Sequence, residues 1–142
     1  MKIQNYEDFL NEGAKYTGNR SHSTFAVQSL SVRDQVHIWH WQTEVGDKHK
    51  ALGDFYDDFL EQIDGLMEVI MGKYGRISIK GIGTPKPLID LSDSDMEEYF
   101  SSKIDMYNSF RNDTFQKDPE IQNKIDEVVE GLDKLKYLLT MS

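Results

Sequence analysis

Residues 75–93 read GRISIKGIGTPKPLIDLSD, and this stretch decides which helical architecture the chain can adopt. Its three glycines and two prolines argue against a continuous helix, because both residue types disfavour the helix interior. Extended at about 3.3 Å per residue, the segment could span roughly 60 Å. It can therefore run the whole length of a helical bundle.

Apolar residues recur at spacings of three and four on both sides of this segment, which is typical of amphipathic helices. The pattern predicts helices over 24–44, 48–74, 95–112 and 119–140. Short links join the first two and the last two helices, whereas the long segment joins the middle pair. The sequence therefore predicts an all-α, ferritin-like four-helix bundle with parallel middle helices, because one long crossover distinguishes this wiring from an up-and-down bundle.

Polar residues mark the predicted helix starts. Residues 23–24 are Ser and Thr, both good N-caps for the first helix. Ser94 and Glu97 have the spacing of a capping box. Asp118 followed by Pro119 offers a cap with proline in the first turn of the last helix.

The composition of the 142 residues excludes several classes of protein. Cysteine is absent, which removes disulfides and thiolate metal sites. Residues 21–142 contain 13 Lys and Arg against 22 Asp and Glu, so we expect no direct DNA binding, which needs clustered cations. No apolar run approaches the ~18 residues of a membrane span, so no membrane partner is expected.

Three of the four histidines lie within thirteen residues, and they are the best candidates for chemistry. His37 and His40 share a helix face that Glu44 extends, and His49 opens the next helix. Residues 47–68 then contain seven acids and two lysines. Imidazole and carboxylate ligands together suit iron, with Zn²⁺ and Mn²⁺ as the other metals that fit this donor set.

Each of these features also has an ordinary interpretation. The acids at 54–61 are typical of a solvated helix face, and clustered histidines can be surface or core residues. Trp39 and Trp41 are typical of core or interface aromatics. Asp64 and Glu68 differ from the other acids, because they stand four apart and flank an apolar region.

Residues 37–41 read HIWHW, residues 49–52 read HKAL, and Asp64 and Glu68 follow on the same predicted helix. Together these motifs resemble the miniferritins, which are the Dps-like proteins of the ferritin-like superfamily. The same HKAL at 49–52, together with FYD at 55–57, also resembles a group of small tailed-phage proteins. The resemblance spans roughly residues 25–75 and implies an iron-binding protein.

The resemblance further implies a ferroxidase site between two subunits, which would oxidise Fe(II) with peroxide or oxygen. His40 and His49 would come from one subunit, and Asp64 and Glu68 would come from its two-fold mate. The ligands expected, in order of preference, are His40, His49, Asp64, Glu68, His37 and Glu44. Two departures predict a weakened site: Gly53 replaces the family's carboxylate, and the 40–49 stretch is three residues shorter than usual.

A shared site predicts a two-fold homodimer along the first two helices, with Trp39 or Trp41 buried in the interface. Asp64 lies 15 residues beyond His49, or about 22 Å along one helix, so only a second chain can bring the two together. The family resemblance implies closure of such dimers into a twelve-subunit shell.

The N-terminus is expected to form an arm over residues 1–20 outside a bundle domain over 21–142. Residues 1–11 predict a short amphipathic helix, and residues 12–23 predict a linker. Residues 1–13 resemble the capsid-targeting leaders of phage internal head proteins, which implies cleavage after Glu12 by a prohead protease. An ordinary docking helix is the alternative for the same residues.

Two functions from different classes therefore follow. The first is an iron-binding, miniferritin-like protein in the host cytoplasm or packaged in a phage head. The second is a noncatalytic bundle that serves as an internal head or assembly protein.

Overall fold

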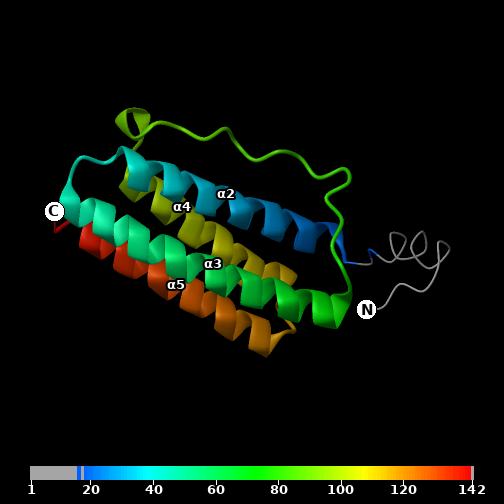
Figure 1. The fold of residues 1–142 in the computed structure, drawn as a ribbon. Coiled ribbons are helices and arrows are strands. Elements are labelled where there is room, and N and C mark those ends of the chain that lie inside the picture. The colour runs from blue at the N-terminus through cyan, green and yellow to red at the C-terminus, as the bar shows by residue number, and fades with distance from the viewer. Residues whose placement is uncertain (1–15, 17, 142) are drawn as a thin grey trace, which may run out of the picture.

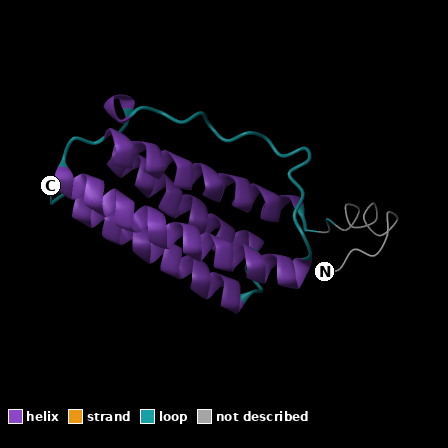
Figure 2. Cartoon of the chain, viewed as in Figure 1, coloured by secondary structure: helices purple, strands orange, loops and turns teal. Residues whose placement is uncertain are grey.

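The computed structural model describes residue 16 and residues 18–141, which form a bundle of helices without strands in that part of the chain (Figures 1 and 2). The arm helix predicted over 1–11 and the predicted cleavage at Glu12 lie outside the described residues. The four main helices are α2 (Arg20–Gln42), α3 (Gly46–Tyr74), α4 (Met96–Ser109) and α5 (Pro119–Leu139). Two short elements complete the fold: the 3-10 turn η1 (Leu91–Asp93) and the π turn η2 (Phe110–Thr114).

The connection between α3 and α4 runs along α2 from one end of the bundle to the other (Figure 1). At its start, the backbone N–H of Gly18 donates to the carbonyl of Arg76 over 2.9 Å. Near its end, Gln35 forms two hydrogen bonds with the backbone of Ile89, and the indole of Trp39 donates to the same carbonyl. These contacts hold the connection at its two ends, beside the start of α2 and against Gln35 and Trp39 of α2.

Contacts between the helices give their directions. Phe55 of α3 lies 6.4 Å from Phe100 of α4, and Phe59 lies 6.3 Å from Tyr107, so α3 and α4 run parallel. Helix α5 runs antiparallel to α3, because Lys73 near the end of α3 pairs with residues at the start of α5. The predicted all-α four-helix bundle is therefore confirmed.

The core lies between the four helices and contains most of the predicted apolar stripes. Trp39 is fully buried there, with its ring 4.8 Å from Tyr99 and 5.9 Å from Phe100. Trp41 instead points outward and is 65% exposed. Of the two tryptophans predicted to be buried by a second chain, only Trp41 is exposed, because Trp39 is already buried within its own chain.

One predicted helix start and one predicted capping residue are wrong. Helix α2 begins at Arg20 and not at 23–24, because the Asn19 side chain caps it by accepting from the backbone N–H of His22 over 3.0 Å. Residues 20–23, which were predicted to belong to a linker over 12–23, are therefore helical. Helix α4 is capped by Asp95, whose carboxylate accepts from the Glu98 N–H, instead of by a Ser94 capping box.

No helix in the described part of the chain is long and apolar enough to cross a bilayer.

Candidate functional site

The turn between α2 and α3 is closed by a pair of histidines that bond to each other's backbone. Nδ1 of His40 lies 2.7 Å from the carbonyl oxygen of His49, and Nδ1 of His49 lies 2.7 Å from the carbonyl oxygen of His40. The two imidazoles stack with their centroids 3.9 Å apart and their planes 20° from parallel. The structure therefore brings together the first two predicted ligands.

These hydrogen bonds fix the tautomer of both rings. A carbonyl oxygen only accepts, so Nδ1 must carry the proton in His40 and in His49. The lone pair of each neutral imidazole is then on Nε2, which has no hydrogen-bond partner among residues 18–141. Metal-binding histidines commonly have this arrangement, in which one nitrogen donates to a carbonyl and the other binds the ion.

Gly53 makes this arrangement possible. A Cβ atom at position 53 would lie 2.7 Å from Cε1 and 3.1 Å from Nδ1 of His40, closer than atoms in contact normally approach. The sequence identified Gly53 only as a missing carboxylate. In the structure it also provides the space that the His40 imidazole occupies.

The predicted carboxylates lie elsewhere. Asp64 and Glu68 are exposed on α3, the same uninterrupted helix that carries His49, and 15 residues correspond to about 22 Å. Glu44 is exposed in the turn between α2 and α3. Within residues 18–141, no group of three or more His, Asp or Glu side chains is placed to hold a metal ion. One chain therefore supplies two imidazoles and no complete site.

His37 belongs to an aromatic cluster beside the pair. Its ring centroid lies 4.0 Å from that of Tyr56 and 4.2 Å from that of Trp41, but 6.4 Å from that of His40. The cluster links α2 to α3 one helical turn from the stacked imidazoles. In this position His37 packs closely on Tyr56 of α3 and lies farther from His40 than His49 does.

A second polar cluster, at the opposite end of the bundle, was not predicted. His22 is 2% exposed, stacks on Phe115 at 5.4 Å and lies 4.7 Å from the ring of Tyr74. Its Nδ1 is buried without a hydrogen-bond partner. Burial lowers the pKa of His22, and the negative charge of Asp118 opposes this shift only in part.

Asp118 joins α3 to the start of α5 through the same cluster. Its carboxylate accepts from the Tyr74 hydroxyl at 2.6 and 2.7 Å and pairs with the ammonium group of Lys73. Burial would raise the pKa of Asp118, but the hydrogen bonds from Lys73 and Tyr74 outweigh it and lower the pKa. The predicted cap residue of α5 thus anchors two helices and makes no side-chain cap bond.

We expect Gly53→Ala to destabilise the protein, although alanine favours helices more than glycine. The new methyl group should displace the His40 imidazole and break its hydrogen bond to the His49 carbonyl, at a cost of about 1–3 kcal/mol. Gly65→Ala is the matched control on α3, because a Cβ atom at position 65 meets nothing within 4 Å. It should stabilise by up to about 1 kcal/mol.

Urea unfolding of the two variants measures the difference. Equal stabilisation by both alanines would show that His40 does not occupy the space above Gly53.

The buried His22 predicts a loss of stability on acidification. Because its folded-state pKa lies below the ordinary 6.5, the unfolded chain takes up a proton first as the pH falls. The unfolding free energy should therefore decline from about pH 6.5 downward, by at most about 1.4 kcal/mol per pH unit, until the folded-state pKa is passed. His22→Phe keeps a stacked ring, removes the titrating group and should flatten this decline.

Urea unfolding at pH 5, 6 and 7 checks this prediction above the range in which Asp118 titrates. An unchanged slope in His22→Phe would place the acid sensitivity elsewhere.

Comparison with known proteins gives one assignment. Residues 40–139 match the family model described as "Family of unknown function (DUF5856)". No curated protein and no solved structure matches the chain. The matched region covers more than half of the chain and includes the histidine pair, the α2–α3 turn and the three helices that follow. The chain therefore belongs to the DUF5856 family.

Proposed function

We propose that the protein binds Fe(II) at sites shared between two copies of the chain, as a miniferritin-like member of the ferritin-like superfamily. The observation that carries the proposal is the His40–His49 pair, whose rings are fixed by backbone hydrogen bonds and whose Nε2 atoms are free to bind a metal. Imidazole is a suitable ligand for Fe(II), and also for Zn²⁺ and Mn²⁺.

The wiring of the bundle supports the ferritin-like assignment. Helices α3 and α4 run parallel and are joined by a connection that follows the length of α2 (Figure 1). A single long crossover of this kind occurs in ferritin-like bundles, whereas an up-and-down bundle has only short loops.

A second chain could supply the carboxylates that one chain lacks near the histidines. Positions 49, 53, 56, 60, 64 and 67–68 recur at spacings of three and four, so they follow one side of α3. In an antiparallel pair related by a two-fold axis near residues 57–58, His49 of one chain would face Asp64 and Glu68 of the other.

The side chains beside this line are suited to such an interface. Trp41 is 65% exposed and Leu30 is 47% exposed, both on α2, and Leu60 and Met67 of α3 are half-buried. Covering them would stabilise a dimer by roughly 25 cal/mol per Å² of apolar surface removed from water. Assembly of dimers into a twelve-subunit shell is the further expectation from the resemblance.

The expected chemistry at the shared site is oxidation of bound Fe(II). Histidine nitrogens would hold the ions, and the carboxylates would neutralise their charge. With hydrogen peroxide as the oxidant, two Fe(II) ions would each lose one electron, and peroxide with two protons would become two waters.

A mixed dimer tests whether the site is shared. His49→Ala and Asp64→Ala should each abolish protein-dependent oxidation of Fe(II), followed by the absorbance of Fe(III). A dimer with one chain of each variant keeps one intact site of two, because the intact His49 and the intact Asp64 lie on opposite chains. With two affinity tags to purify this dimer, we expect about half of the wild-type rate.

Glu61→Ala is the matched control, because Glu61 is an exposed acid of α3 outside the proposed ligand set. A mixed dimer as inactive as its parents, or a wild-type protein that light scattering shows to be monomeric at micromolar concentration, would contradict the shared site. Failure of the wild-type protein to bind Fe(II) would leave the noncatalytic bundle, an internal head or assembly protein, as the function.

A further inference from the structure

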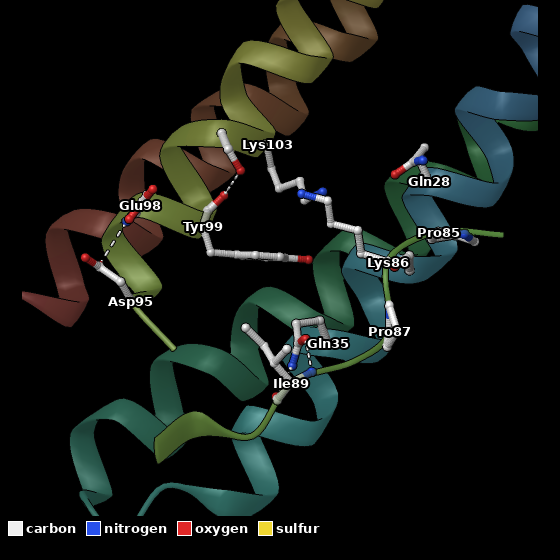
Figure 3. A pocket seen from close by; sticks show the side chains of 12 residues that line it. Gln28, Gln35, Pro85, Lys86, Pro87, Ile89, Asp95, Glu98, Tyr99 and Lys103 are labelled. Atoms are coloured by element: carbon white, nitrogen blue, oxygen red, sulfur yellow. Dashed lines mark hydrogen bonds between the residues drawn. The ribbon is translucent and has the colours of Figure 1, made fainter. Parts of the chain in front are cut away.

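A groove of about 470 Å³ lies between α2, the segment before η1 and α4, away from the histidine pair (Figure 3). Its volume is within the range of sites that bind small molecules, about 300–1,000 Å³. Pro85, Pro87 and Ile89 contribute apolar surface from the crossover, and Tyr99 contributes an aromatic ring from α4. The groove exists because the crossover is held against α2.

Two lysines from different elements converge in this groove. Lys86 comes from the crossover and Lys103 from α4, and Figure 3 shows their side-chain nitrogens pointing toward one another. Partial burial lowers the pKa of Lys103, and the positive charge of Lys86 lowers it further. Neither ammonium group forms an ion pair within residues 18–141, although the chain has more acids than bases.

The surroundings of the two lysines are poor in negative charge. Residues 75–89 contain three cations and no acid, in a chain with 25 Asp and Glu. The α2 side of the groove offers only neutral polar side chains, such as Gln28. Asp95 and Glu98 also line the groove, but at the start of α4, where the Asp95 carboxylate accepts from the Glu98 backbone N–H over 3.1 Å.

The floor of the groove suits an apolar or aromatic group. The ammonium nitrogen of Lys103 lies 5.2 Å from the centre of the Tyr99 ring, so the charge is held over an aromatic face instead of extending into water. The ring itself is held in place by edge contacts with Trp39 and Phe100. The lysine and the ring therefore present a positive charge beside a fixed apolar surface.

We propose that this groove binds a small phosphorylated molecule, with its dianionic phosphoryl group between Lys86 and Lys103 and its organic part on Tyr99 and the two prolines. Such a group would relieve the repulsion between the two ammonium ions and form charge-assisted hydrogen bonds with both. The net charge of −9 opposes a long polyanion such as duplex DNA, so the ligand is a small one.

Inorganic phosphate and phenyl phosphate at pH 8 are the probes, followed by NMR on the full chain. Both should shift the side-chain signals of Lys86 and Lys103, and phenyl phosphate should bind more tightly because its ring adds contact with Tyr99. Lys103→Met and Lys86→Met should each weaken binding by roughly tenfold or more, since each removes a charge-assisted hydrogen bond.

Lys80→Met is the matched control, because Lys80 is an exposed lysine of the same crossover that does not line the groove. It should change affinity less than twofold. No shift at Lys86 or Lys103 with either probe at millimolar concentration, or equal weakening by all three variants, would overturn the proposal. Equal affinity for inorganic phosphate and phenyl phosphate would overturn the proposed contact between the organic part and Tyr99. The groove would then be a site for inorganic phosphate.

Discussion

Two hydrogen bonds, each from Nδ1 of one histidine to the backbone carbonyl of the other, hold α2 and α3 together at the turn that joins them. They fix the register of α2 against α3 across a turn of three residues, 43–45. They also set the tautomer of His40 and of His49, so that both Nε2 lone pairs are free. The close approach of His40 to α3 in turn requires a residue without a side chain at Gly53. The packing of α2 against α3, the tautomers of His40 and His49, and the glycine at position 53 therefore depend on one another.

The crossover has a second set of consequences. Because Gln35 and Trp39 bind the backbone at Ile89, the connection is held on α2, and α4 starts at the same end of the bundle as α3. The crossover runs beside α2 and, together with α2 and α4, lines the lysine groove. The side of α2 and α3 that carries Trp41 stays uncovered. One connection therefore forms a wall of the lysine groove on one side of α2 and leaves Trp41 uncovered on the other.

Much of the fold followed from the sequence, because it depends on local patterns. The glycines and prolines of 75–93 predicted the crossover, and the apolar spacings predicted α3 and α5 to within two residues at each end. Helix starts were less predictable, since several neighbouring residues can cap. Asn19 and Asp95 cap these helices although serines and threonines that could also cap lie nearby. Which residue caps depends on the packing of the helix, and a sequence pattern does not show that packing.

The sequence identified the two histidines of the pair, but it did not predict how their side chains are arranged. Spacing across the turn brought His40 and His49 together, but their mutual hydrogen bonds and the role of Gly53 depend on how closely two helices approach. His22 was missed because the rings that bury it, those of Tyr74 and Phe115, are far away in the sequence and no local pattern connects them. Which tryptophan faces the core also depended on the phase of α2 against α4, which leaves Trp39 inside and Trp41 outside.

The protonation site of the two imidazoles is the most direct measurement of this account. Nitrogen-15 NMR of the histidine side chains distinguishes the two neutral tautomers, and Zn²⁺ serves as a diamagnetic substitute for Fe(II). We expect His40 and His49 both to carry the proton on Nδ1 above neutral pH, and added Zn²⁺ to shift their Nε2 resonances. Protons on Nε2 in both rings, with no response to Zn²⁺, would contradict the paired arrangement and the metal site proposed from it.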